Sequence, residues 1–452
     1  MLFKRIFIAG TVAALLSTAV PASGQTSATG IEIPAMGVQF HATWSDYTWD
    51  ERLDVLDKMA AAGVKWVRVD LGWASFQEGG RGSYSDWYAK RVDRIVDEAA
   101  TRGIKVLGTI WWTPGWANGG AGRGAPPHDP QDFGNFARWV ANRYQGRVAA
   151  WEIWNEPNLD DFFTGTAGDY VDLLKAAYPA IKEADPAAQV VLGGPSYNDT
   201  KWLSKVYEAG AQGYFDVMST HPYQGEADLH PEAPDDGTIW RIAHTKAVHA
   251  LMERYGDGDK KIWFTEYGWS THPTEPGAPN WMRGVTLEQQ ADFLVRSLKY
   301  IGDKFPYVTN VFWYNERDTK SGNIQVDNYG LLYRDLTPKP SYFAMKTFLT
   351  SQEIGSPDPT PTVSPTPTTG EAPPTTPSPD ETTPPVEDPG TVDPAPTPAP
   401  TAAPDPNPSP TVALDAAFTP TVKAGERGSK PCKRFKKRWR RRHCRHARAA
   451  RA

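Results

Sequence analysis

Two apolar runs of the sequence end in a glutamate, in WEIWNEPN (151–158) and in KIWFTEYGW (261–269). Glu156 follows two tryptophans, and a carboxyl group packed against indole rings is poorly solvated, which favours its protonated form. Hydrolysis of a glycosidic bond requires one carboxyl group that protonates the departing oxygen and another that attacks carbon or activates water. Glu156 and Glu266 are therefore a candidate pair for this chemistry. The alternative is that both are ordinary carboxylates at strand ends.

Between residues 31 and 351, short apolar runs alternate with amphipathic helical segments, which is typical of α/β proteins with a parallel sheet. The predicted strands are 37–42, 64–71, 104–110, 148–154, 189–195, 215–221, 261–267 and 308–314. Predicted helices include 50–62, one that begins at Asp129-Pro130, and one that begins with a capping box from Thr286 to Gln289. Eight such pairs in about 320 residues predict a (β/α)8 TIM barrel. A doubly wound open sheet is the alternative, but no glycine-rich phosphate loop follows the first strand.

In a barrel of this kind, chemistry takes place on the loops at the carboxyl ends of the strands. Polar and aromatic residues gather where the predicted strands stop, and the candidates for substrate binding are His41, Arg68, Trp112, Asn155, His221, Tyr223 and Trp313. Glu156 and Glu266 end the fourth and seventh strands, so we expect them to face each other across the barrel mouth. This predicts a separation of about 5 Å, as in enzymes that retain the anomeric configuration.

The motifs around both glutamates, together with Arg68, His221-Pro222-Tyr223 and Trp313, resemble clan A of the glycoside hydrolases. The segments GVQFHATWSDYTWDERLDVLDKMAAAGVKWVRVD and TPGWA are most similar to glycoside hydrolase family 39, with family 5 as a near neighbour. The resemblance extends over residues 31–349. It implies a retaining glycoside hydrolase built on a TIM barrel.

The resemblance also implies roles for the residues around the two carboxyl groups. Glu156 would be the acid/base and Glu266 the nucleophile, and Asn155 would hydrogen-bond to the 2-hydroxyl of the sugar. Arg68 and Tyr223 would keep Glu266 ionised, because a cation and a hydroxyl donor bonded to a carboxylate lower its pKa.

The remaining candidates would form the walls of the site. By resemblance, His221 would support the acid/base and Trp313 would be the platform under the reacting sugar. This chain has Trp111-Trp112 after the third strand, where some clan members have a histidine. His41, from the first strand, would compensate for that difference, and Asp70 would support the neighbouring arginine.

Three terminal segments differ in composition from the barrel. Residues 1–24 combine a charged start, an apolar run and small residues before a cleavage site, which predicts a secretory signal peptide and an extracellular protein. Residues 352–412 are rich in proline and threonine, which predicts a disordered, extended linker. Residues 413–452 form a basic tail, in which residues 423–452 hold 14 Lys and Arg against one Glu, so the chain before residue 423 has a net charge of about −18.

The basic tail predicts a partner of opposite charge. An anionic polymer of the cell surface or cell wall fits this composition, nucleic acid is a less favoured alternative, and a solvated free end is the simplest reading. Both cysteines of the chain, Cys432 and Cys444, lie in this tail and would be able to close a small loop. The barrel therefore has no disulfide framework and no thiolate metal site. No segment of the mature chain is apolar enough to predict a membrane span.

The favoured function is a secreted retaining hydrolase that cuts β-glycosidic bonds inside a polysaccharide, because the 18 tryptophans and the long loops 116–127 and 271–284 would line a groove. One alternative is an exo-acting enzyme, β-xylosidase-like or uronidase-like. Another is a non-catalytic polysaccharide-binding protein at the cell surface. No cofactor or metal is expected, since His128, Asp129 and 257–259 match no ligand set and are better explained by turns.

Overall fold

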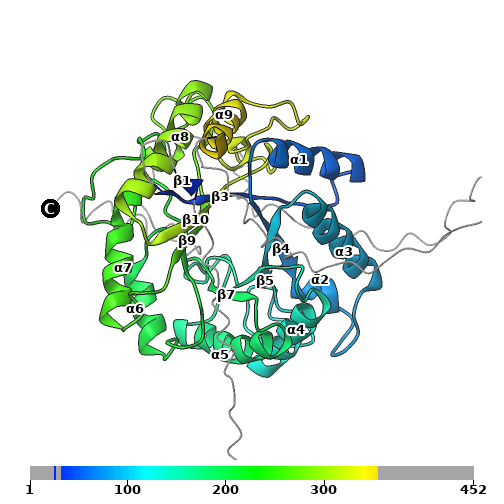
Figure 1. Ribbon diagram of the computed structural model, residues 1–452. Helices are drawn as coiled ribbons and strands as arrows, with labels where there is room; N and C mark the ends of the chain where they lie inside the picture. Colours follow the sequence, from blue (N-terminus) through cyan, green and yellow to red (C-terminus); the bar gives the residue numbers. More distant parts are fainter. Residues whose placement is uncertain (1–24, 27–31, 355–452) are drawn as a thin grey trace, which may run out of the picture. The chain divides into compact units, whose positions relative to one another are not determined.

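The computed structural model describes residues 25–26 and 32–354, and most of them form an eight-stranded parallel barrel enclosed by helices (Figure 1). The strands are β3 (Ala35–Gln39), β4 (Trp66–Gly72), β5 (Lys105–Trp111), β6 (Ala150–Ile153), β7 (Gln189–Leu192), β8 (Met218–Thr220), β9 (Ile262–Tyr267) and β10 (Val308–Trp313). Their order is β7-β6-β5-β4-β3-β10-β9-β8. Backbone bonds from Asp216 N to Val190 O (2.8 Å) and from Leu192 N to Val217 O (3.0 Å) join β7 to the residues directly before β8. The predicted TIM barrel is confirmed.

Each strand is followed by helical chain that packs on the outside of the sheet. The helices are α1 (Trp49–Ala61), α2 (Trp73–Gln77), α3 (Asp86–Thr101), α4 (Pro130–Arg143), α5 (Ala167–Ala184), α6 (Thr200–Glu208), α7 (Thr245–Arg254), α8 (Leu287–Lys304) and α9 (Pro340–Ile354), with short 3-10 turns η1 (Ile242–His244), η2 (Asn280–Met282) and η3 (Val326–Asn328). The predicted caps are present. Asp129 accepts from the backbone of Gln131 before α4, and Thr286 forms a capping box with Gln289 before α8.

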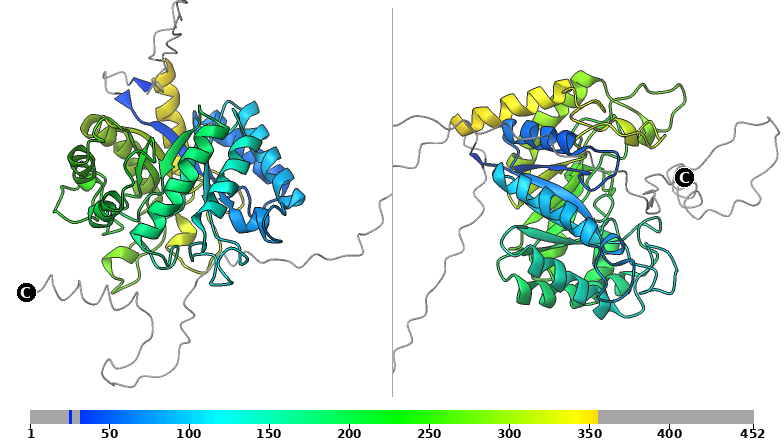
Figure 2. Two further views of the ribbon diagram at one scale, coloured as in Figure 1. Left: turned by 90° about the horizontal axis from the view of Figure 1, so that it is seen from below. Right: turned by 90° about the vertical axis from the view of Figure 1, so that its right-hand side faces the viewer.

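A short antiparallel ribbon, β1 (Gln25–Thr26) with β2 (Glu32–Ile33), lies beside α9, as both views of Figure 2 show. Helix α9 continues to residue 354, three residues past the predicted end of the catalytic domain. The signal peptide (1–24), almost all of the linker (352–412), the basic tail (413–452) and both cysteines lie outside the described residues. Within residues 25–26 and 32–354, no helix has the length and apolar character of a membrane span.

One end of the barrel interior is filled by large apolar side chains. The buried cluster comprises Trp66, Leu107, Ala150, Val191, Val217, Trp263 and Phe312. The rings of Trp66 and Trp263 meet edge to face with centroids 5.2 Å apart. Gly37 is needed in this layer because a Cβ there would lie 2.5 Å from the ring of Phe312. The layer closes the barrel, so a site can open only at the other end.

Two residues further along the strands, the inward side chains become polar. Because side chains alternate across a strand, these positions form the next layer of the interior. The layer includes Gln39, Arg68, Thr109, Glu152, Ser219 and Thr265, all of which are buried. The barrel interior therefore changes from an apolar to a polar layer within two residues along each strand. We call the buried apolar cluster the apolar plug and the six polar residues above it the polar floor, which lies directly below the strand ends.

We expect the apolar plug to carry much of the stability of the barrel. Trp263→Ala should lower the free energy of unfolding by about 3–5 kcal/mol, because it removes a buried indole and leaves a cavity. Trp87→Ala is the matched control, since Trp87 is 64% exposed on α3 and should cost less than about 1 kcal/mol. Urea denaturation measures both values, and equal losses would show that the plug is not a stabilising core.

Candidate active site

The structure brings the two glutamates of the sequence motifs to the same end of the barrel. Glu156 follows β6 and Glu266 lies on β9, and each is 8% exposed. One carboxylate oxygen of each glutamate and a ring nitrogen of His221 all lie within 4.8 Å of one another. This is the close spacing expected of two carboxyl groups that act in a double displacement, and it leaves less room than an inverting pair requires.

The backbone around this site is strained. Four non-glycine residues at the carboxyl ends of β5, β6 and β7 adopt positive φ angles, which are Trp112 (67°), Trp154 (74°), Glu156 (43°) and Tyr197 (59°). Such conformations cost energy and concentrate at functional sites. Gly193 also belongs to this region, because a Cβ there would lie 2.3 Å from the carbonyl oxygen of Ile153. The close packing of the backbone at the ends of β6 and β7 places the side chain of Glu156 at the carboxyl end of the barrel.

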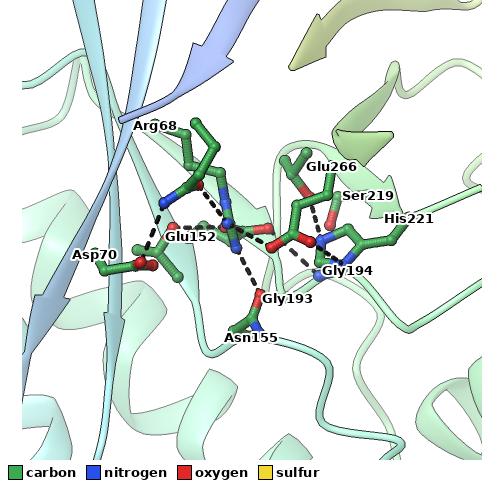
Figure 3. A network of polar contacts seen from close by, with 12 residues as sticks. Arg68, Asp70, Glu152, Asn155, Gly193, Gly194, Ser219, His221 and Glu266 are labelled. Carbon is green, nitrogen blue, oxygen red and sulfur yellow. Dashed lines mark hydrogen bonds and ion pairs between the residues drawn. The ribbon is translucent and has the colours of Figure 1, made fainter. Parts of the chain in front are cut away.

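Arg68 is the centre of the polar floor and is 1% exposed (Figure 3). Its Nε donates to Glu152 (2.7 Å), its Nη1 donates to Glu266 (2.8 Å) and to Gln39 (2.7 Å), and its Nη2 donates to Asn155 (2.7 Å). A guanidinium has five N–H donors and no acceptor, so every atom it faces must accept. The amide oxygen of Asn155 is therefore fixed toward Arg68, and its NH2 group remains available for a ligand.

Glu152 is a third glutamate that the sequence analysis did not identify. It is fully buried, accepts from Thr109 Oγ1 (2.7 Å) as well as from Arg68, and accepts weakly from the backbone of Gly194 (3.4 Å). Burial opposes its ionisation, but the charges of Arg68 and His221 outweigh this effect and lower the pKa of Glu152. The sequence held a signal for it, since a glutamate inside the apolar run WEIW must have a buried partner.

His221 lies between the two glutamates. Its Nδ1 is 3.0 Å from Glu156 Oε1 and 3.7 Å from Glu266 Oε2, and its Nε2 is 3.0 Å from Thr265 Oγ1. Burial disfavours the charged ring, but the two carboxylates outweigh it and raise the pKa of His221. The predicted position beside Glu156 is therefore observed, and the ring also contacts the second carboxyl group.

Glu266 has the predicted partners but not the predicted titration. Arg68 Nη1 and Tyr223 OH both donate to it, at 2.8 and 3.0 Å. Even so, burial raises the pKa of Glu266 above its ordinary value, and the charges of His221 and Arg68 only partly offset this. The expectation of a lowered pKa was wrong because the burial of Glu266 outweighs the charges of Arg68 and His221, and the nearby carboxylates of Glu156 and Asp70 raise the pKa further.

His41 contacts neither of the paired glutamates. Its Nδ1 lies 3.0 and 3.3 Å from the two carboxylate oxygens of Glu316, which also accepts from Tyr47 OH (2.7 Å). The ring of His41 packs on Trp44 with centroids 4.0 Å apart. Burial works against the charged ring, but Glu316 outweighs it and raises the pKa of His41. Glu316 was missed because nothing in the sequence after β10 separates it from the other acidic loop residues.

The aromatic candidates fall into two groups. Trp112 is half-buried at the end of β5 and stacks on Trp111, with ring centroids 4.3 Å apart. Trp313 is fully buried, packs against Tyr267 and donates to the carbonyl of Tyr329. It cannot serve as a sugar platform, because its position on β10 directs it into the core between the sheet and the helices.

The tryptophans of the WEIWNEPN motif are also core residues. Trp151 and Trp154 are fully buried, and Trp154 packs against Phe133 and Phe163. The expectation that indole rings surround the carboxyl of Glu156 is not met, since the carboxyl lies against the ring of His221. These rings anchor β6 and the turn that follows it.

Glu156, His221 and Glu266 also form the group of described residues whose ligand atoms are close enough to hold a metal ion. Arg68 already donates to one oxygen of Glu266 and Tyr223 to the other. A cation at this point would be repelled by the guanidinium 2.8 Å from its ligand. The donor set therefore fits paired carboxyl chemistry better than metal binding.

The raised pKa of Glu266 predicts a stability cost of the site. A carboxyl group with a higher pKa in the folded state destabilises the fold at pH values above that pKa, and the cost disappears below the unfolded value of about 4.3. Glu266→Gln should therefore increase the free energy of unfolding at pH 7, and the gain should shrink toward zero as the pH falls below 4. Urea denaturation at several pH values checks this, and a gain that does not depend on pH would contradict it.

Comparisons with known proteins agree with this geometry. The model of the family described as cellulase (glycosyl hydrolase family 5) matches residues 26–318. A β-xylosidase of Caldicellulosiruptor saccharolyticus is 26% identical over 327 residues, which cover 66% of this chain and 64% of the relative. A β-xylosidase of Geobacillus stearothermophilus is 26% identical over 290 residues, which cover 57% of this chain and 55% of the relative. The chain thus spans less than two thirds of both relatives.

Among solved structures, a family 39 glycoside hydrolase from the gut symbiont Bacteroides cellulosilyticus WH2 matches with a TM-score of 0.56 at 24% identity, covering 70% of this chain and 64% of that one. This likeness shows a shared barrel fold. The resemblance to clan A, with families 39 and 5 as neighbours, is confirmed. Because the family model covers more than half of the sequence, the chain belongs to glycosyl hydrolase family 5, the cellulase family of this clan of retaining glycoside hydrolases.

Proposed function

We propose that the protein hydrolyses β-glycosidic bonds by double displacement, with Glu266 as the nucleophile and Glu156 as the acid/base. The observation that carries this proposal is the pair itself, two carboxyl groups with oxygens within 4.8 Å of each other at the open end of the barrel. The two groups have different partners. Glu266 accepts from Arg68 and Tyr223, whereas Glu156 meets His221.

In the first step, a carboxylate oxygen of Glu266 bonds to the anomeric carbon while the bond to the leaving oxygen breaks. Glu156 transfers its proton to that oxygen, which leaves as an alcohol. In the second step, Glu156 removes a proton from water, the resulting hydroxide bonds to the anomeric carbon, and the ester to Glu266 breaks. Both carboxyl groups return to their starting states, and the anomeric configuration is retained.

The polar floor supports this sequence of charges. When Glu266 becomes an ester it loses its negative charge, but Arg68 remains bonded to Glu152 and does not become an unpaired buried cation. Asn155, oriented by the same arginine, presents its NH2 group to the sugar. His221 holds the carboxyl of Glu156 at one oxygen, which leaves the other for the leaving group.

The surroundings of the pair favour a neutral reacting sugar over a uronic acid. Four of the five donors of Arg68 are already bonded, so it has little capacity to bind a substrate carboxylate. Asp70 and Glu316 add negative charge near His41 and Glu266. A charged sugar would be repelled here, so neutral aryl β-glycosides are the appropriate assay substrates, with an aryl β-glucuronide as the negative comparison.

The polymer substrate and the mode of attack belong to the same proposal. Long loops after β5 and β9 and half-buried aromatic residues such as Trp112 and Trp116 suit a groove that binds several sugars, so we propose internal cleavage of a polysaccharide. Two relatives that are β-xylosidases favour the alternative of an exo-acting enzyme that trims chain ends. An extracellular location, expected from residues 1–24, would suit a polymer too large to enter a cell and stays a prediction.

Substitutions at the two glutamates should differ in a diagnostic way. Glu266→Ala should lose at least about 10³-fold in kcat on every aryl β-glycoside, and azide should restore turnover with an inverted glycosyl azide as product. Glu156→Ala should keep most of its kcat/KM on substrates with highly acidic leaving groups, but its kcat should fall because the second step lacks its base. Azide should raise this kcat and give a product of retained configuration.

Glu253→Gln is the control for these two variants, because Glu253 lies on the surface of α7, and it should behave like the wild type. If wild type and Glu266→Ala bind glycans equally and neither turns over any substrate, the protein is a binding module instead.

The size of the first products distinguishes the two modes of attack. Internal cleavage should release oligosaccharides early and lower the viscosity of a β-1,4-xylan or β-glucan solution before much reducing sugar appears. The exo-acting alternative releases monosaccharide from the start with little change in viscosity. Chromatography of the products during the first few per cent of reaction decides between them, and monosaccharide alone would refute internal cleavage.

A further inference from the structure

Arg123 lies in the glycine-rich loop between β5 and α4 and is half-buried. Its guanidinium carbon lies 5.4 Å from the centroid of the Trp112 ring, and Trp112 in turn stacks on Trp111 at 4.3 Å. This cation–π contact holds the arginine over the second indole. We call the pair Arg123 and Trp112 the arginine shelf.

The backbone ties the shelf to the active site. Thr113 N donates to Arg123 O, and Thr164 N donates to Gly124 O, both at 2.9 Å. The shelf therefore lies between the end of β5 and the loop that follows Glu156. Trp112 is also one of the residues with a positive φ angle, a strain that concentrates at functional sites. We therefore expect a sugar chain bound across the paired glutamates to pass close to this arginine.

Within residues 25–26 and 32–354, Arg123 forms no ion pair with a carboxylate. Asp160 and Asp161, in the loop after Glu156, are exposed. Arg81 offers a direct contrast. Its guanidinium lies 5.7 Å from the Trp116 ring but also pairs with Asp132 at 2.7 Å.

We propose that the arginine shelf binds the carboxylate of a uronic acid residue that decorates the substrate next to the cleaved bond. This inference rests on the proposed function and deepens it, since it assigns an acidic polysaccharide as the substrate class. A planar guanidinium binds a carboxylate through two parallel hydrogen bonds, and one already held by an indole loses little freedom on binding. The reacting sugar is neutral, and the negative charge lies on its neighbour.

The shelf can be tested without any hydrolysis, with D-glucuronate and D-glucose as probes and tryptophan fluorescence as the readout. The wild type should bind glucuronate at least about tenfold more tightly than glucose, and salt should weaken this preference. Arg123→Ala should abolish the preference and Arg123→Lys should keep part of it, because a lysine retains the charge but not the planar pair of donors. Arg81→Ala, the matched control, should bind both probes as the wild type does.

A wild type without preference for glucuronate overturns the proposal, as does Arg81→Ala losing the preference equally or Arg123→Ala keeping it. Hydrolysis of a neutral aryl β-glycoside by the wild-type preparation tests the proposed function separately. Turnover without a glucuronate preference refutes only the shelf. A glucuronate preference that depends on Arg123, without turnover of any aryl glycoside, refutes only the proposed hydrolysis.

Discussion

The site depends on one buried guanidinium that bonds to four side chains. Arg68 holds Glu266 with one nitrogen, Asn155 with the second and Glu152 with the third. Without Glu152, Glu266 would be the one carboxylate among the described residues that forms an ion pair with this buried cation. With Glu152 present, the charge of Arg68 is shared between two carboxylates, and the hydrogen bond from Arg68 fixes the orientation of Glu266.

The fold was predictable because each of its elements carried its own local signal. All eight strands lie within a few residues of their predicted ranges, and the caps at Asp129 and Thr286 begin the expected helices. The meeting of Glu156 and Glu266 followed from the fold itself, since parallel strands deliver their carboxyl ends to one rim. The positions of Arg68, Asn155, His221 and Tyr223 followed from the resemblance.

The sequence could not show the direction in which single side chains point. Trp313 and Tyr314 are neighbours at the end of β10, so their side chains point to opposite faces of the sheet. Trp313 therefore lies in the core outside the barrel and not at the barrel mouth. The balance of charges was also out of reach, because the pKa of Glu266 depends first on its burial and then on charged side chains from several other strands, which the motif around it does not reveal. A motif can indicate which two residues interact, but the combined effect of several charged residues depends on their positions in the structure.

The left-handed turns at the barrel rim limit how this enzyme can evolve. Trp112, Trp154, Glu156 and Tyr197 each hold a backbone shape that would suit glycine better. A substitution that removes the strain at any of these positions would stabilise the fold but shift the backbone that positions the paired glutamates. Selection for a more stable barrel would thus favour stabilising substitutions in the outer helices and leave these four positions unchanged.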